Sequence, residues 1–256
     1  MRSLTILLLI TFFISCSENE VLVSSTTEVT VNEENCTYST NGYIHNQGLD
    51  NILQSYTSRD RWMYSEVFDS LKTFVKNQKD FINTEGGYNL TDSDMETIIE
   101  TMQPILPQIV NNEVDSITFY MLENGVSEVL VNQLKEVSNI LNQDYSTFEE
   151  GINAIEDYEI TLINNGDMTD ILQESINLLK SSLCYWNTNV QNWAEIDYVG
   201  AQYRGFWDTI NGMGESDFWS FAVVTAVTFN PGAGVAAGCY GSAAKGIRDV
   251  VTGNCC

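Results

Sequence analysis

The chain has 256 residues, of which 43% are hydrophobic, enough for one globular domain with a buried core and a short tether. Its formal net charge of −24 argues against nucleic acid as a partner, because phosphate groups would be repelled. There is one histidine, so a metal site built from two or more histidines is excluded.

The N-terminus has the pattern of a secretion signal. Arg2 provides a positive start, residues 4–14 are apolar, and the small residue Ser15 precedes Cys16. We predict that residues 1–15 are a signal peptide and that Cys16 becomes the lipidated first residue of the mature chain. An ordinary cleaved signal, or an uncleaved anchor, is the alternative.

The next segment has the composition of a tether. Residues 17–35 are rich in Ser, Thr, Glu and Val, with no Gly or Pro and no helical period. We therefore predict a lipidated N-terminus and flexible tether over residues 16–41, with an alternating strand over residues 21–31 as the alternative. Fully extended at about 3.3 Å per residue, such a tether would hold the folded part clear of a bilayer.

The helical domain is expected over residues 42–256, and its first part contains His45. A nucleophile with His45 and Asp50 could form a catalytic triad, but the sequence has no G-x-S-x-G or comparable motif around a nucleophile. We therefore interpret His45 as a satisfied or solvent-facing histidine near a helix start, and we predict no catalytic residue and no cofactor.

Four segments in the middle of the chain show the apolar period of amphipathic helices: residues 64–75, 95–109, 126–141 and 152–163. Gly86 and Gly87 should end the first, and Pro104 and Pro107 should kink or end the second.

Residues 89–96 resemble a calcium loop superficially. They lack the glycine at the sixth position and the terminal glutamate at the required spacing. We predict instead a helix N-terminus with acidic residues in its first turn and no metal site.

The longest helix is predicted over residues 170–194. Its apolar residues alternate steps of four and three, which is typical of a coiled-coil-like seam. They are Leu172, Ile176, Leu179, Leu183, Trp186, Val190 and Trp193.

Residues 218–244 form the longest stretch without a charge. The sequence Asn230-Pro231-Gly232 divides it into two arms, each too short to span a membrane alone. We predict a helical hairpin, with Ser216 or Asp217 as N-cap of the first arm and the second arm from Ala233 to about Val251. The predicted fold is an all-α, irregular helical bundle with this Gly/Ala-rich C-terminal hairpin in its core.

Small residues recur every four positions along the second arm and predict a stripe on which another helix can pack closely. They are Gly234, Gly238, Ser242 and Gly246.

Five cysteines remain besides Cys16, and their spacing shows no C-x-x-C motif. In an exported protein these cysteines can form two disulfides and leave one thiol, in a pairing that the sequence does not specify. They are Cys36, Cys184, Cys239, Cys255 and Cys256.

Residues 13–16 (FISC) resemble the lipobox of bacterial lipoproteins. With the acidic residues 17–20 (SENE), the stretch 45–50 (HNQGLD) and the C-terminal hairpin, they resemble lipoproteins of Bacteroidota-type bacteria. The resemblance implies a palmitate-bearing anchor in the outer membrane of the cell envelope, and residues 17–20 favour exposure at the cell surface. It implies no known activity.

We expect a tethered binding or structural module that contacts the membrane through its lipid and has an unknown protein or glycan partner. An enzyme is not expected. The alternative is a membrane-active protein, because the second arm also resembles the glycine-zipper helices of bacteriocin-like peptides.

Overall fold

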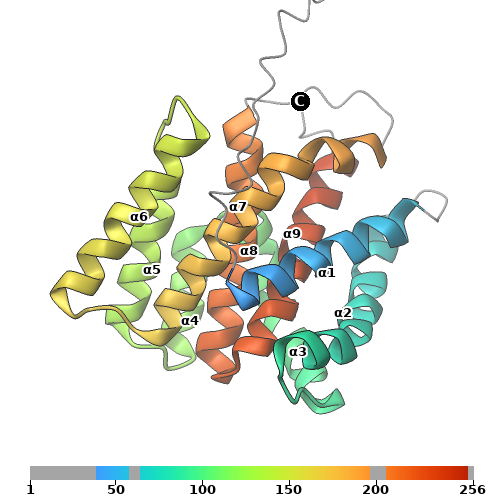
Figure 1. Cartoon of the computed structure of the whole chain (residues 1–256). Coiled ribbons are helices and arrows are strands. Elements are labelled where there is room, and N and C mark those ends of the chain that lie inside the picture. Colours follow the sequence, from blue (N-terminus) through green and yellow to red (C-terminus); the bar gives the residue numbers. More distant parts are fainter. Residues whose placement is uncertain (1–38, 58–63, 197–205, 253–256) are drawn as a thin grey trace, which may run out of the picture. The chain divides into compact units, whose positions relative to one another are not determined.

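The computed structural model describes residues 39–57, 64–196 and 206–252, all of which lie in the unit Glu33–Cys256. Within these residues the chain forms helices and no strand, which confirms the predicted all-α class (Figure 1). The predicted signal peptide, Cys16 and most of the predicted tether lie outside the described residues. The helices are α1 (Thr40–Thr57), α2 (Tyr64–Gly86), α3 (Asp92–Val110), α4 (Val114–Glu123), α5 (Glu128–Leu141), α6 (Phe148–Asn165), α7 (Asp170–Ile196), α8 (Phe206–Thr228) and α9 (Pro231–Thr252).

Side-chain caps explain where several helices begin. Thr91 and Asp94 form a capping box at the start of α3, as the interpretation of residues 89–96 as a helix N-terminus anticipated. At the starts of α5 and α6, the side chains of Ser127 and Thr147 each accept one hydrogen bond, from the backbone N–H groups of Leu130 and Glu150. At the other end, α6 stops at Gly166, which has φ +74° and accepts the left-handed conformation at no steric cost.

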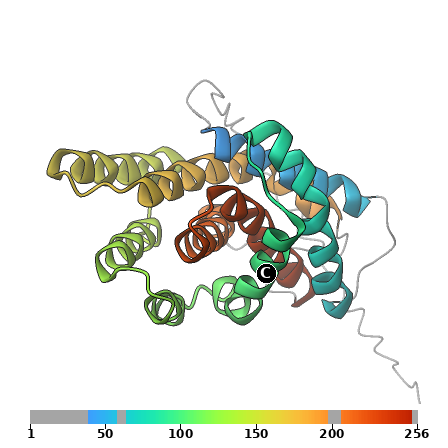
Figure 2. The same ribbon diagram turned by 90° about the horizontal axis from the view of Figure 1, so that it is seen from below.

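The hairpin of α8 and α9 is the centre of the fold. The two helices pack most extensively against each other, and α7, α1, α2 and α3 pack around them (Figure 2). The side chains of residues 210–226 and 233–244 are almost all buried. The Gly/Ala-rich hairpin therefore lies in the core, as predicted from its lack of charge.

Helices α4, α5 and α6 follow one another along the side of the bundle. Helix α4 packs on α3 and α8, α5 packs on α7 and α8, and α6 contacts α5 and α7. A hydrogen bond also joins α9 to the end of α3. Lys245 Nζ donates to the carbonyl of Val110, the last residue of α3, at 3.0 Å. A cation at that position also interacts favourably with the helix dipole.

The expected N-cap of the hairpin is wrong, and of the two effects expected of Pro104 and Pro107 the helix end does not occur. Ser216 and Asp217 do not cap a helix, because α8 begins at Phe206 and both residues lie inside it. Both side chains are fully buried in the core, so these polar residues contact other helices and do not mark the end of a helix. Pro104 and Pro107 do not end α3, which continues to Val110.

The close approach between α8 and α9 depends on Gly234 and Gly241. A Cβ atom at Gly234 would lie 1.9 Å from Thr225 Oγ1, and one at Gly241 would lie 1.9 Å from Ser220 Oγ. Gly238 lies instead beside His45 of α1. A spacing of seven stays on one helix face, whereas successive steps of four drift around the helix, so the predicted stripe contacts α8 and α1 in turn.

The other two residues of the predicted stripe, Ser242 and Gly246, are also buried, but Gly246 has room for a methyl group beside Met213. Among the residues that the structure describes, no helix combines the length and apolar character required to cross a membrane.

Candidate functional site

His45 is the sixth residue of α1 and faces the central hairpin. Its side chain is fully buried, and its Nε2 atom lies 3.1 Å from Oδ1 of Asp217 in α8, whose side chain is also fully buried. Its Nδ1 atom lies 3.0 Å from Oδ1 of Asn46. The Asn46 amide is oriented by its Nδ2, which donates to the carbonyl of Ser181 at 3.1 Å. Both ring nitrogens therefore face oxygen acceptors.

Asp217 is held by α7 as well as by α1. Ser182 Oγ and Trp186 Nε1 both donate hydrogen bonds to Asp217 Oδ2, the second at 3.0 Å. From the 3.1 Å contact we assign His45 and Asp217 as an ion pair, which joins α1, α7 and α8 at the middle of the core.

The pKa of His45 agrees with this assignment. Burial alone would lower it, but the charge of Asp217 and the hydrogen bonds to Asp217 and Asn46 together outweigh burial and raise the pKa above its ordinary value. The contact has the length of an ion pair, and it lies between two charges removed from water.

Glu215 is a second buried acid of α8, two residues before Asp217. Ser138 Oγ and Asn142 Nδ2 of the α5 region both donate to its Oε1 atom, the second at 3.0 Å. Burial raises the pKa of Glu215, and these hydrogen bonds only partly oppose that effect.

The two raised pKa values predict how stability depends on pH. A raised pKa means that the folded chain binds the proton more tightly than the unfolded chain. His45 therefore contributes stability that is complete below its unfolded pKa of 6.5 and is lost as pH rises through its folded pKa. Glu215 likewise contributes stability that is complete below its unfolded pKa of 4.5 and is lost as pH rises through its folded pKa. We expect a higher melting temperature at about pH 5.5 than at about pH 8.5.

Thermal melts across that pH range test the expectation, with Glu215→Gln as the matched variant, which should show a weaker dependence. Asp92, Asp94 and Asp115 have lowered pKa values and lose stability only as pH falls below about 4, outside the range compared. A melting temperature that rises from pH 5.5 to 8.5 would contradict the assignment of both groups.

The triad considered from the sequence is not assembled. Asp50 accepts a hydrogen bond from Tyr185 Oη at 3.0 Å, and the acid beside His45 is Asp217 instead. Because both members of the His45–Asp217 pair are fully buried, neither can touch a substrate in this arrangement, and their role here is structural.

The two described cysteines differ in state. Cys184 is disulfide-bonded, and its partner is not among the described residues. Cys239 is free and buried, and its Sγ donates to the carbonyl of His45 at 3.3 Å. Burial, with the charge of Asp217, raises the pKa of this thiol well above its ordinary value, so it stays protonated and unreactive. Cys16, Cys36, Cys255 and Cys256 lie outside the described residues.

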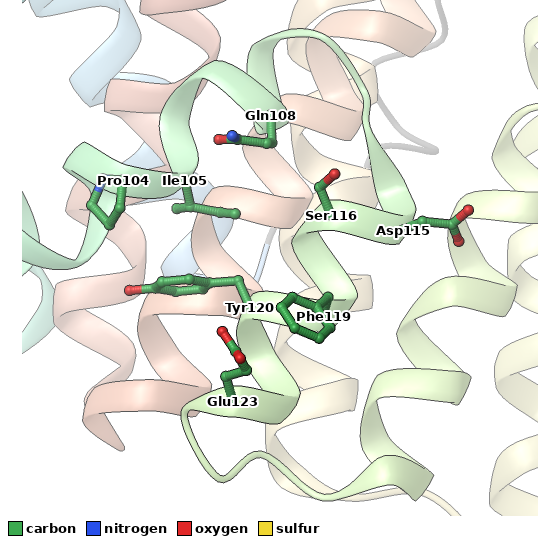
Figure 3. A pocket seen from close by; sticks show the side chains of 8 residues that line it. All are labelled: Pro104, Ile105, Gln108, Asp115, Ser116, Phe119, Tyr120 and Glu123. Atoms are coloured by element: carbon green, nitrogen blue, oxygen red, sulfur yellow. The ribbon is translucent and has the colours of Figure 1, made fainter.

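A surface hollow between α3 and α4 is the second candidate site, and we call it the α3–α4 hollow. Its volume is about 530 Å³, within the range of small-ligand sites. Helix α3 contributes the first three of its residues and α4 the other five. The lining residues are Pro104, Ile105, Gln108, Asp115, Ser116, Phe119, Tyr120 and Glu123 (Figure 3).

The aromatic residues of the α3–α4 hollow differ in how they are held. Tyr120 points from α4 toward α3, where its hydroxyl donates to the carbonyl of Thr101 at 3.2 Å (Figure 3). Phe119 is 59% exposed. The hollow therefore combines a fixed ring with a solvent-exposed one.

The two carboxylates of the α3–α4 hollow also differ. Asp115 points away from the other lining residues and forms an ion pair with Lys135 of α5 at 2.6 Å (Figure 3). Glu123 lies below Tyr120 and forms no ion pair with any described side chain. In the part of the chain that the structure covers, no group of three His, Cys, Asp or Glu residues could hold a metal ion.

Sequence reasoning missed both Asp217 as the partner of His45 and the α3–α4 hollow. The available signal for the first was Asp217 at the edge of the uncharged stretch, which we interpreted, with Ser216, as a candidate helix cap. For the second, α4 itself was not among the predicted helices.

A scan against protein-family models, a search of curated proteins and a search of solved structures all gave no match.

Proposed function

We propose that the chain is an exported lipoprotein, anchored through Cys16 to the outer membrane of a bacterial cell envelope, whose helical body binds a partner. The positive start, the apolar residues 4–14 and Ser15 before Cys16 support export and lipidation. The composition of residues 17–35 supports a tether between lipid and body. The partner is a protein or a glycan, and the acidic residues 17–20 favour the cell surface.

The observation that carries the binding role is the α3–α4 hollow with its exposed aromatic ring. Large exposed aromatic side chains beside a concave surface are common anchors of binding sites. The remainder of the described body offers a well-packed helical scaffold to hold such a site, since its core extends from α1 to α9. A scaffold that positions a surface site needs no catalytic group.

Lipidation has a direct test. We expect Cys16→Ser to release the protein from the membrane fraction and to abolish labelling with a palmitate analogue. Membrane fractionation and acyl-chain labelling measure these results, and Cys239→Ser, which changes a buried thiol, is the matched control that should remain labelled. Continued labelling of the Cys16→Ser protein would show that the lipoprotein assignment is wrong.

The binding role is tested with the full-length protein in its envelope. A photo-crosslinking residue placed at Phe119 should give discrete adducts, and one placed at Phe229, which is 82% exposed near the start of α9, should not. Equal adducts from both positions, or none from either, would remove the support for a binding site at the hollow.

The membrane-active alternative requires the α8–α9 hairpin to leave the core. That movement would break the His45–Asp217 pair and separate Gly238 from His45, and it would carry two buried acids with it. The net charge of −24 also opposes approach to anionic lipid. Dye release from anionic liposomes by the purified protein would favour this alternative over a binding module.

A further inference from the structure

The α3–α4 hollow is formed by a part of the chain that contains acidic residues and no basic ones. Between Lys79 and Lys135 the sequence contains no Lys or Arg, and this interval includes all of α3 and α4. The residues that line the hollow include two carboxylates and no basic side chain. Its surroundings therefore attract cations and repel anions.

Glu123 is the carboxylate available to a ligand. Asp115 already faces Lys135 at 2.6 Å, which lowers the pKa of Asp115 through the hydrogen bond and the charge of the lysine. Glu123 is exposed at the last position of α4, beside Tyr120, without an ion pair among the described residues. A cationic group over the face of Tyr120 would meet both a carboxylate and the negative side of an aromatic ring.

The apolar part of the hollow is also available. Phe119 is exposed, Leu122 on the same helix is 43% exposed, and Pro104 opposite them is exposed on α3. Tyr120 is fixed by its hydrogen bond to Thr101, and Ile117 and Met121 of α4 are fully buried, so α4 is held firmly while Phe119 remains outside. An apolar side chain from a partner could cover Phe119 without displacing any described contact.

Resting on the binding function proposed above, we infer that the α3–α4 hollow binds a basic segment of a partner protein, which places an apolar side chain on Phe119 and a Lys or Arg beside Glu123. The negative charge of residues 80–134 favours a basic partner. The exposed ring of Phe119 favours a partner with an apolar residue next to its basic one. A free small cation would use Glu123 alone, so a segment that also covers the ring binds more tightly.

The test uses the purified full-length protein in detergent and the synthetic peptide acetyl-Arg-Phe-Lys-Leu-Arg-amide, with acetyl-Glu-Phe-Glu-Leu-Glu-amide as the charge-reversed peptide. Isothermal titration calorimetry should show saturable binding of the basic peptide and none of the acidic one. Binding should weaken as salt is raised, because its electrostatic part is screened.

Matched variants locate the site. We expect Glu123→Gln and Phe119→Ala each to weaken binding of the basic peptide about tenfold, the size of effect expected for an anchor residue. Glu156→Gln makes the same charge change on an exposed acid of α6, and Ile160→Ala removes an apolar side chain of similar exposure, 54%, from the same helix. Both controls should bind as the unchanged protein does, and all four variants should melt alike.

Equal binding of both peptides, or equal effects of the α4 and α6 variants on binding, would overturn the inference. So would binding of tyramine, used as a free small cation, as tight as that of the basic peptide. The last would indicate a site for a small cation. Failure here is distinct from failure of the proposed function, because crosslinks at Phe119 without discrimination between the peptides would keep the binding role and remove only the basic partner.

Discussion

Gly241→Ala is expected to lower the melting temperature of the protein, whereas Gly246→Ala in the same helix is expected to raise it. A Cβ at Gly241 would lie 1.9 Å from Ser220 Oγ, 2.8 Å from Ser220 Cβ and 2.9 Å from the carbonyl oxygen of Ser216. The hydroxyl can rotate, but the Ser220 Cβ and the Ser216 carbonyl move only with the backbone of α8. Overpacking of this kind costs about 1–3 kcal/mol.

Helix propensity acts in the opposite direction, since Ala is favoured over Gly inside a helix by about 1 kcal/mol. At Gly246 only propensity acts, because the nearest atom to a new Cβ would be Met213 Cε at 3.5 Å, an ordinary contact. For a domain of this size, 1 kcal/mol corresponds to roughly 2–4 °C in melting temperature. Thermal melts of the two variants therefore separate packing from propensity, and equal shifts for both would mean that α8 and α9 do not approach closely at Gly241.

The helices with a clear apolar period could be predicted from sequence because burial of one helix face leaves a visible pattern. Helix α7 begins at Asp170 as predicted, and Leu172, Ile176, Leu179, Leu183 and Trp186 of its seam are all buried. Helix α6 covers the predicted residues 152–163 and ends at Asn165, with Gly166 as its cap. Helix α4 is short, with only Ile117, Thr118 and Met121 buried, so it carries too few apolar residues to show a period.

The candidate sites could not be predicted because they depend on contacts between distant parts of the chain. His45 and Asp217 are far apart in sequence, and an acid that begins an apolar stretch has the same appearance whether it caps a helix or lies inside one. The α3–α4 hollow depends on how two helices pack, and the exposure of Phe119 beside it follows from the same packing. Local pattern therefore specified the helices, and packing of the helices created the sites.

The largest effect is expected at the His45–Asp217 pair. Asp217→Asn should lower the melting temperature when His45 is present and raise it in the His45→Leu protein. His45→Leu leaves the buried Asp217 carboxylate without its cation, and breaking a buried ion pair from one side costs about 3–5 kcal/mol. We expect the lower end of this range, because Ser182 and Trp186 continue to donate to Asp217. Asp217→Asn alone should also destabilise the protein, since it removes the counter-charge of the His45 imidazolium.

In the His45→Leu background, however, Asp217→Asn should raise the melting temperature. The carboxylate is then an unpaired buried charge, and an amide removes that charge while its oxygen still accepts hydrogen bonds from Ser182 and Trp186. A double-mutant cycle measured by thermal or denaturant unfolding yields the coupling directly. Additive effects would mean that the two side chains do not form a charged pair. A stable His45→Leu protein that loses partner binding would instead give His45 a role in function, because a purely structural residue should affect binding only through stability.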